Sequence, residues 1–522
     1  MPGSEFTEPA PYLERSGRKG GHLDGVPVVE HHRAAPPADD LRRTERLAEE
    51  LRSRLMLSPR SEIEELVPTH LGAGPALHID DLSGIHEFAP FVRYACVQDR
   101  ARLRAGDGDI IACSLPPVAG YEDYCRDRLG LGESTWLVAR TSTHPSWIAA
   151  ALWRDPEVRT QLVAAVRQGR VRYLHPHMGS RAVWQLALLL RQAAGRSLQV
   201  IAPPPALTSW VNDKVAFAQT LEQLFGAGAL PPTTWAANFT SLAHRVRGMA
   251  SSADTIVVKH PESAGGHGNV ILDGRRIRGR PLGAVRDLLR RALPDWKQDR
   301  SLLVSHWEEP VLQSPSLHVW VPPQPQGPPI VEGIFEQRLL PGTHGWRGAV
   351  AAQLPECTTR RMVDRCWLMA YLYQRLGYVG RCSFDILLVG TDPEQAFVHL
   401  LECNGRWGGA SLPMTLMNRL FGDWATREFA VSTITPPPGR YPALTSLLDA
   451  LDVWDVRTGR GSVILSNPGC LAAGFGFEAI TLGSDRAEAI DRAEREVPAR
   501  VLTLLHRDEA RRKDTPQRVA LA

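Results

Sequence analysis

Apolar and polar residues follow one another along the chain in patterns that are typical of both strands and helices. Within residues 60–210, the apolar runs DIIACSL, STWLVAR and VRYLHPH have the length of buried strands. The helical pattern SRAVWQLALLLRQAAG then separates VRYLHPH from another apolar run, SLQVIAP. A strand, a helix and a strand in that order predict a βαβ unit, and therefore a parallel sheet.

Changes in this pattern divide the chain into four predicted parts. At 522 residues the chain is too long for one hydrophobic core, and Pro-rich turns at 203–205 and 436–439 mark two of the boundaries. The predicted parts are an arm with an amphipathic helix (1–56), an α/β domain (57–210), a mixed α/β region (211–435, divided near 300) and a small C-terminal domain (436–522). The predicted fold class is α/β (α+β).

Composition narrows the functional classes. Hydrophobic residues make up 43% of the chain and charged residues 22%, which is ordinary for a globular protein. The net charge of +3 gives no argument for nucleic acid as a partner. We find no secretory signal in residues 1–40, no apolar run approaching the roughly 20 residues of a membrane helix, and no CxxC pair among the eight cysteines. These features predict a cytoplasmic protein with reduced thiols that binds neither nucleic acid nor membrane.

Lysine is rare in this sequence. Of 60 basic residues only five are lysines, at positions 19, 214, 259, 297 and 513. A lysine that is retained within the folded region is a candidate for a role that needs a compact ammonium rather than a planar guanidinium. Lys214 and Lys259 lie in the two segments where such a role is expected.

A nucleotide site is predicted around these two lysines. The segment TIVVKHPESAGGHGNVIL places Lys259 at the end of an apolar strand and before a glycine-rich loop, whose backbone N–H groups could approach phosphate oxygens. Lys214 opens a helix, where Asn212 or Asp213 could also act as the cap. A plain hairpin turn and a plain helix start remain the alternatives. The candidate nucleotide-binding residues are Lys214, Lys259, Gly265, Gly266, His267, Gly268, Val304, His306, Trp307 and Glu308, the last four as an adenine connector that could equally be a simple strand end.

A metal site is predicted in the segment CSFDILLVGTDPEQAFVHLLECNGRWGG. Two alternating apolar strands flank a turn at 391–396, and pairing Gly390 with Phe397 would place Asp385 opposite Glu402 and Ser383 opposite Asn404. Asp385, Glu402 and Asn404 would then share one face, with Phe384, Ile386, Leu388, Leu401 and Cys403 on the apolar face. Facing carboxylates repel, and Mg²⁺ would remove that repulsion. The alternative is a solvated hairpin face, since a slip of one residue would separate the acids.

Two arginines flank this hairpin. Arg406 follows Asn404 by two residues, and its guanidinium could hold the charge on a transferring phosphoryl group or on a substrate carboxylate. Arg381 precedes the first strand and is the weaker candidate for the same task, because it could be an ordinary surface arginine.

Taken together, residues 211–430 resemble the ATP-grasp superfamily. The resemblance is carried by the Asn-Asp-Lys helix start, the VVK strand with its glycine-rich loop, and the Glu-x-Asn-x-Arg end of the hairpin preceded by Asp385. It implies that Lys214 and Lys259 bind ATP phosphates, that Asp385, Glu402 and Asn404 hold Mg²⁺, and that the Arg assists acyl-phosphate formation. The region before 211 looks like a pre-ATP-grasp domain and the segment 211–300 like a lid. The adenine connector, which reads Ser-His-Trp-Glu-Glu, departs from the family pattern.

The layout, with the segment GIFEQRLLPGTHGWRG (Gly333–Gly348), looks most like peptide ligases of the pheganomycin type. That resemblance implies an ATP-dependent carboxylate–amine ligase of antibiotic or other peptide biosynthesis, with a modified amino acid as the acid, an amine or peptide as the acceptor, and a possible homodimer. Two alternatives remain: a biotin-carboxylase-like enzyme, although no Met-Lys-Met attachment signal is present, and a non-catalytic nucleotide-binding protein.

Overall fold

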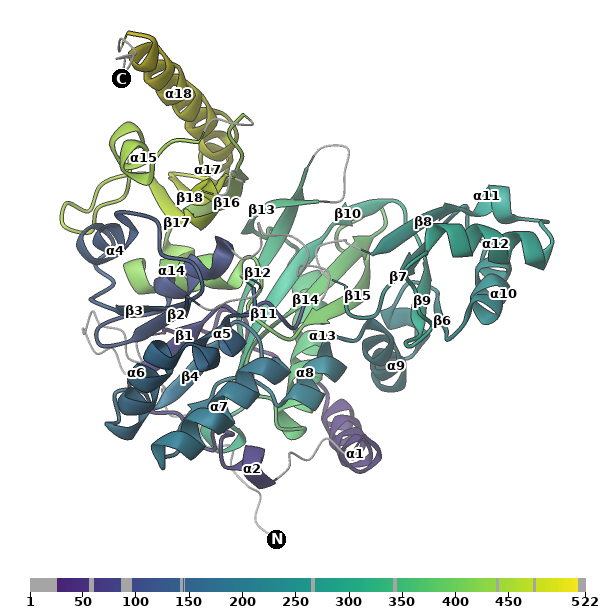
Figure 1. Ribbon diagram of the computed structural model, residues 1–522. Helices are drawn as coiled ribbons and strands as arrows, with labels where there is room; N and C mark the ends of the chain where they lie inside the picture. The colour runs from purple at the N-terminus through teal and green to yellow at the C-terminus, as the bar shows by residue number, and fades with distance from the viewer. Residues whose placement is uncertain are drawn as a thin grey trace, which may run out of the picture.

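The computed structural model describes residues 26–55, 61–85, 96–140, 144, 146–263, 268–340, 345–437, 441–472 and 476–514. Most of the predicted N-terminal arm and three of the predicted nucleotide-loop residues, Gly265, Gly266 and His267, lie outside these ranges. In the part that is described, the strands form sheets of five, four and nine strands. Figure 1 shows the four-stranded sheet in a lobe that projects from the rest of the molecule.

The five-stranded sheet is parallel and has the order β3-β2-β1-β4-β5. Its strands are β1 (Ala76–Ile79), β2 (Ile110–Cys113), β3 (Thr135–Val138), β4 (Tyr173–Pro176) and β5 (Gln199–Val200). Its helices are α2 (Ser61–Glu64), η2 (Cys96–Leu103), α4 (Tyr121–Asp123), η3 (Tyr124–Arg128), α5 (Ile148–Arg154), α6 (Pro156–Arg167) and α7 (Arg181–Ala194). The predicted βαβ unit is therefore confirmed as β4, α7 and β5. Helix α7 begins where the Ser180 hydroxyl accepts a bond from the Val183 N–H, and it ends at Gly195 with φ +64°.

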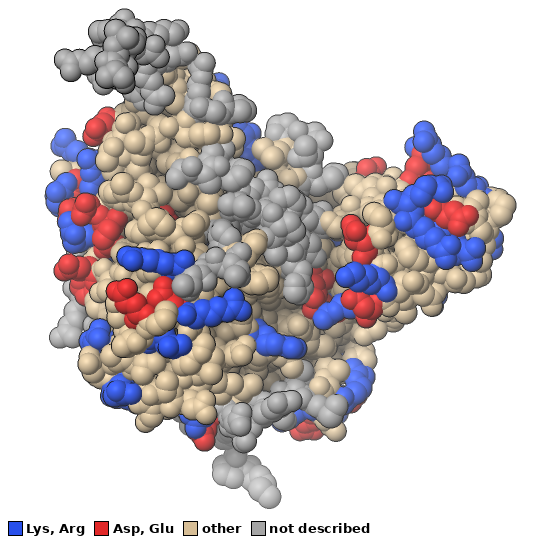
Figure 2. All heavy atoms as spheres, viewed as in Figure 1, with Lys and Arg blue, Asp and Glu red and all other residues tan. Residues whose placement is uncertain are grey.

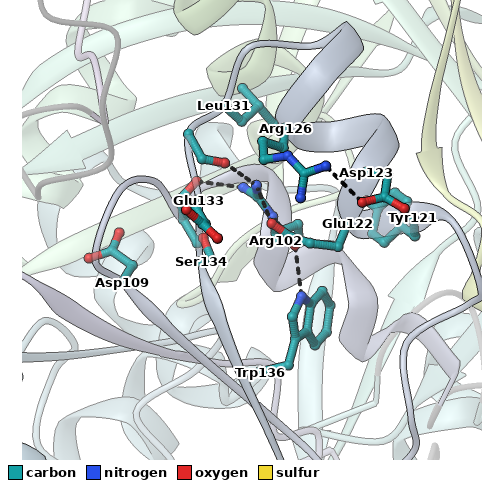
Figure 3. A network of polar contacts seen from close by, with 12 residues as sticks. Arg102, Asp109, Tyr121, Glu122, Asp123, Arg126, Leu131, Glu133, Ser134 and Trp136 are labelled. Carbon is teal, nitrogen blue, oxygen red and sulfur yellow. Dashed lines mark hydrogen bonds and ion pairs between the residues drawn. The ribbon is translucent and has the colours of Figure 1, made fainter.

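A buried arginine joins the outer elements of this sheet. Arg102 of η2 donates from Nε and Nη2 to the two carboxylate oxygens of Glu122, at 2.6 and 2.9 Å (Figure 3). The Trp136 indole N–H donates to the same carboxylate at 2.7 Å. Since Arg102 is fully buried, this network satisfies its charge and fixes η2 against β3.

The four-stranded sheet is antiparallel, with the order β6-β9-β7-β8. Its elements are β6 (Thr233–Ala236), α10 (Phe239–Met249), β7 (Thr255–Lys259), β8 (Asn269–Asp273), α11 (Gly274–Ile277), α12 (Leu282–Ala292) and β9 (Leu302–His306). One sheet face packs on α10 and α12, because Ile256, Val258 and Leu272 meet Val285 and Leu289 there.

Basic side chains gather on the surface of this lobe (Figure 2). They include Arg275 and Arg276 of α11 and Arg290 of α12, all largely exposed and all within ion-pair distance of an aspartate. Exposed pairs of this kind contribute little to stability. This surface charge is distinct from Lys259, which lies at the end of β7 and is partly buried.

The nine-stranded sheet is antiparallel and forms the centre of the molecule. Its order is β10-β14-β11-β12-β13-β16-β18-β17, with β15 also paired to β14. The strands are β10 (Val311–Gln313), β11 (Pro315–Val321), β12 (Ile330–Leu339), β13 (Trp346–Ala351), β14 (Gly380–Val389), β15 (Phe397–Asn404), β16 (Glu428–Ile434), β17 (Val463–Asn467) and β18 (Phe477–Gly483). Because β18 pairs with β16, the strands of the predicted C-terminal part continue this central sheet.

Helices cover both faces of the central sheet. One face packs on α1 (Ala38–Arg54), α9 (Lys214–Phe225) and α13 (Glu356–Arg375), and the first of these confirms the amphipathic helix predicted within residues 1–56. The remaining helices are α8 (Pro205–Asn212), η4 (Ala227–Ala229), η5 (Gln324–Gln326), α14 (Ser411–Phe421), η6 (Trp424–Thr426), α15 (Leu444–Ala450), α16 (Gly469–Ala472), α17 (Arg486–Asp491), η7 (Arg492–Glu496) and α18 (Val497–Asp514). Among the helices of the described ranges, none is long and apolar enough to cross a membrane.

Candidate active site

The predicted hairpin is formed by β14 and β15. Asp385 pairs with Glu402 and Ser383 with Asn404, so the predicted register is confirmed where the polar residues lie. The assumed starting pair is wrong: Phe397 pairs with Val389 rather than with Gly390. A β-bulge after Asp385 accounts for both results, because it shifts the register by one residue between the turn and the site.

The same bulge changes the apolar face of β15. Leu400 is fully buried in the cluster that holds Phe384 and Ile386, whereas Leu401, the predicted core residue, is only half-buried. The extra residue of a bulge reverses the alternation on one side of it. The assignment of Leu401 to the apolar face was therefore wrong, and that of Phe384, Ile386, Leu388 and Cys403 is confirmed.

Lys214 contacts the acidic pair directly. It is the first residue of α9, where the Asp213 side chain accepts bonds from the N–H groups of Val215 and Ala216, so the predicted cap is Asp213. The Lys214 ammonium lies 2.8 Å from Oε2 of Glu402 and also donates to the Ser263 carbonyl. The capping and the placement of the charge occur together at this residue.

Lys259 approaches the same pair from the four-stranded sheet. Burial lowers the pKa of Lys259; Lys214 acts in the same direction, and the charges of Glu402 and Asp385 oppose it. The three charged groups are thus close enough to influence Lys259, although they belong to three different elements. This arrangement brings together four of the predicted site residues.

Asp385 is held by neutral amides. Its two oxygens accept bonds from Gln337 at 3.1 Å and from Asn404 at 3.2 Å. Burial, followed by the charge of Glu402, raises the pKa of Asp385 to about 7. The charge of Arg406 and a hydrogen bond from Ser316 oppose that rise in pKa without cancelling it.

The pKa of Glu402 is shifted in the opposite direction to that of Asp385. Burial alone would raise the pKa of Glu402, but Lys214, Lys259 and Arg406 together hold it below its ordinary value. Lys214 balances the charge of Glu402, so part of the repulsion between the facing carboxylates is already reduced within the protein, and the magnesium site stays a prediction. Asp385 is the carboxylate for which a further cation would be most favourable.

Arg406 lies beside Asn404, as predicted. Its guanidinium donates to the Asn404 side-chain oxygen. Burial lowers the pKa of Arg406, and Glu402 and Asp385 oppose that shift. The Gly405 N–H donates to the Asn212 side-chain oxygen at 3.0 Å, which ties the end of β15 to the corner between α8 and α9. Both predicted site segments are thereby fixed to one another.

Arg381 lies in another environment. It is buried, and its guanidinium donates from Nε and Nη2 to both oxygens of Glu332, at 2.9 and 2.8 Å. It also lies over the rings of Trp320 and Trp407. The alternative that it is a surface arginine is wrong, while its assistance to catalysis stays a prediction.

The predicted adenine connector lies along and after β9. Val304 pairs with Thr234 on one side and Val258 on the other, so its backbone lies inside the sheet. The N–H groups of His306 and Trp307 donate to the carbonyls of Pro232 and Thr255. These two N–H groups are engaged within the protein; adenine contacts of Val304, His306, Trp307 and Glu308 stay predictions.

In the nucleotide loop, Gly268 has φ +77°, a conformation that favours glycine.

The oxygen ligands at the hairpin are suited to a Mg²⁺ ion that is bound jointly by the protein and by phosphate groups. Mg²⁺ is commonly bound by one or two carboxylates, with substrate and water oxygens completing its shell. Asp385 and Glu402 would supply those carboxylates. Asn404 directs its oxygen to Arg406 and its amide to Asp385, so its use as a ligand requires the amide to rotate. Over the described ranges, no group of three His, Cys, Asp or Glu side chains could hold a metal.

Gln337 is one of the contacts of this site that sequence reasoning missed. It lies on β12, within the segment 333–348 that was noted only for its general layout. Its amide reaches Asp385 across β11, which lies between their two strands. Because that pairing joins strands 48 residues apart, no local pattern indicated it.

Comparisons with known proteins agree with the α/β architecture. Residues 98–192 match the family described as Pre ATP-grasp domain. No curated protein matches the sequence. The match lies within the predicted α/β domain 57–210, and the mixed α/β content that the sequence predicted is confirmed by a parallel sheet followed by two antiparallel ones. The ATP-grasp assignment of residues 211–435 stays a prediction.

Several solved structures are similar in outline. An ADP complex of purK, N5-carboxyaminoimidazole ribonucleotide synthetase, is 12% identical with a TM-score of 0.48, over 83% of this chain and 97% of that chain. The biotin carboxylase domain of 2-oxoglutarate carboxylase from Hydrogenobacter thermophilus is 12% identical with a TM-score of 0.47, over 81% and 89%. Biotin carboxylase from Campylobacter jejuni is 12% identical with a TM-score of 0.48, over 81% and 94%. At these values the likenesses carry no conclusion about the reaction of this chain.

Proposed function

We propose that this protein is an ATP-dependent carboxylate–amine ligase that forms an amide, and most specifically a peptide, bond. The observation that supports the proposal is the meeting of Lys214, Lys259, Glu402 and Asp385 beside Arg406, from separate elements. The three cations can bind the negative charge of the phosphates, and the two carboxylates can hold the metal ion that a phosphoryl transfer needs. The narrower assignment to pheganomycin-type peptide ligases rests on the sequence layout alone.

In the proposed reaction, an oxygen of the substrate carboxylate attacks the γ-phosphorus of ATP, and the bond to the bridging oxygen of ADP breaks. The amine nitrogen then attacks the carbonyl carbon of this acyl phosphate, the carbon–oxygen bond to phosphate breaks, and the nitrogen loses a proton. Lys214 and Lys259 bind phosphate oxygens, and Arg406 balances charge on the transferring group. Asp385 and Glu402 would hold Mg²⁺, which when bound neutralises phosphate charge. No covalent enzyme intermediate is needed.

A panel of acids and amines tests the proposal. We expect ADP release that requires both an acid and an amine. The highest rates are expected with modified amino acids as the acid and peptides as the amine. An ¹⁸O label in the acid should appear in the released phosphate, because the acyl-phosphate oxygen leaves with it. ADP release with bicarbonate alone would identify a carboxylase instead. Binding of nucleotide without turnover of any pair would identify a non-catalytic binding protein, and either result would overturn the proposal.

Lys259→Met should reduce turnover by about 10²–10³-fold, because it removes an ammonium aimed at developing charge. The change keeps the length of the side chain and removes a desolvation cost, so the melting temperature should not fall. Lys297→Met is the matched control, since Lys297 is an exposed lysine outside the site. Equal turnover of the two variants would contradict the proposed role of Lys259.

A further inference from the structure

Trp407 directly follows Arg406 and is almost completely buried, with 5% of its surface exposed. Its backbone N–H donates to the His177 carbonyl at 3.1 Å, and the preceding residue, Arg406, forms an antiparallel bridge with Met178. His177 and Met178 follow β4 in the parallel sheet. The backbone on both sides of Arg406 is therefore anchored to a different sheet from the one that carries Asn404.

Two guanidinium groups lie over the indole ring of Trp407. The central carbon of Arg381 is 4.6 Å from the ring centroid, and that of Arg104 is 5.1 Å from it. Each arginine is held by its own carboxylate: Arg381 by Glu332, and Arg104 by Asp80 at 2.5 Å. The indole thus lies between groups from the central sheet and from the parallel domain.

Arg104 supports an electrostatic role for the ring. Its side chain is buried, and its Nε and Nη1 atoms have no hydrogen-bond partner among the described residues. A buried donor without a partner is costly, and the face of an indole is a favourable alternative for a guanidinium. A purely aliphatic residue at position 407 could fill the space, but it would leave these groups of Arg104 uncompensated.

We infer that Trp407 is a positioning residue that fixes Arg406 beside Asn404 through the Arg381 and Arg104 contacts. This inference rests on the proposed function, in which Arg406 balances the charge of the transferring group. A displacement of such a group by about 1 Å can reduce turnover about 100-fold without affecting ground-state binding. Trp407 itself touches neither substrate nor nucleotide in this scheme.

Trp407→Phe and Trp407→Leu test the inference by splitting kcat from KM. The leucine variant should lose kcat by about 10–100-fold with little change in the KM for ATP. The phenylalanine variant should retain an intermediate kcat, because its ring is a weaker partner for guanidinium groups. If the role is only structural, kcat will instead fall in proportion to the melting temperature. The ranking of the two variants by kcat will then not follow the strength of their rings as cation–π partners. That result would overturn the inference.

Trp153→Leu is the matched control. Trp153 lies on α5, away from the hairpin, and the Arg159 guanidinium lies over its ring at 5.6 Å. The variant removes the same kind of contact, so a loss of stability with unchanged kcat is expected. An equal loss of kcat in Trp153→Leu would show that the effect at Trp407 is general destabilisation.

Hydrogen exchange separates this inference from the proposed function. Trp407→Leu should speed amide exchange at residues 405–407 by about 10-fold or more, while Trp153→Leu leaves it unchanged. If the wild type turns over no acid and amine, the proposed function fails, and exchange alone decides whether Trp407 fixes the segment. Unchanged exchange in both Trp407 variants would reject the positioning role even in an active enzyme.

Discussion

Glu402→Gln should lower magnesium-dependent turnover about 1,000-fold or more. The substitution keeps the shape of the side chain and removes only its negative charge. Glu402 is the carboxylate that balances Lys214 at 2.8 Å and that influences Lys259. Its loss therefore removes one of the two negative charges of the proposed metal site and the ionic partner of Lys214.

Two effects combine in this variant. A metal site with one carboxylate in place of two should bind Mg²⁺ more weakly, since carboxylates are the preferred ligands of this ion. In addition, Lys214 loses its ionic partner, and the charge that helps to raise the pKa of Asp385 disappears. More Mg²⁺ should thus restore only part of the activity, because the second effect does not depend on the metal.

The measurement is ADP release as a function of Mg²⁺, together with calorimetric binding of Mg²⁺ and ADP. Glu394→Gln provides the control, because Glu394 is an exposed residue in the turn of the same hairpin. The control should retain full turnover and nucleotide binding. Turnover of Glu402→Gln within a few-fold of the wild type, at any Mg²⁺ concentration, would remove Glu402 from the proposed machinery.

The hairpin shows how far sequence patterns reach. Alternation and a short turn predicted both strands, but Asp385 came to lie opposite Glu402 only because the wrong starting pair, Gly390 with Phe397, was offset by the bulge. The position of the bulge was not predictable, since one extra residue leaves the apolar pattern almost unchanged. The prediction of the acidic pair succeeded because the bulge lies between the pair and the turn.

Contacts between segments that are distant in the chain could not be predicted from sequence patterns. The carboxylate partner of Arg381 lies 49 residues away, on a strand two places removed in the sheet. Arg104 and Trp407 meet only because the parallel domain packs against the end of β15. A local pattern can indicate a strand or a cap, but the choice of partner across a sheet depends on a topology that no window of sequence contains.

Glu332→Gln should destabilise the protein by about 3–5 kcal/mol, because it leaves the buried Arg381 guanidinium without its counter-charge. Glu332 is fully buried, and both of its oxygens accept bonds from Arg381. Burial raises the pKa of Glu332 even though Arg381 opposes that shift. The cost is large because the guanidinium that remains is buried and would have no other carboxylate to balance its charge.

The matched control is Glu45→Gln, which makes the same change in an exposed pair. Glu45 lies 3.2 Å from Arg375, and both side chains are more than a third exposed. Water and salt screen such a pair, so the free energy of unfolding should fall by less than about 1 kcal/mol. Urea unfolding of both variants gives the comparison, and a similar small cost for the two would show that Arg381 finds another partner.

A double variant distinguishes the unpaired charge from the loss of packing. Glu332→Leu combined with Arg381→Met removes both charges and keeps apolar volume, so it should recover part of the stability that Glu332→Gln loses. The recovery should be incomplete, because Arg381 also lies over the rings of Trp320 and Trp407, and methionine cannot replace those cation–π contacts. A double variant that is less stable than Glu332→Gln would mean that Arg381 stabilises the fold mainly through the rings, so that its carboxylate partner is secondary.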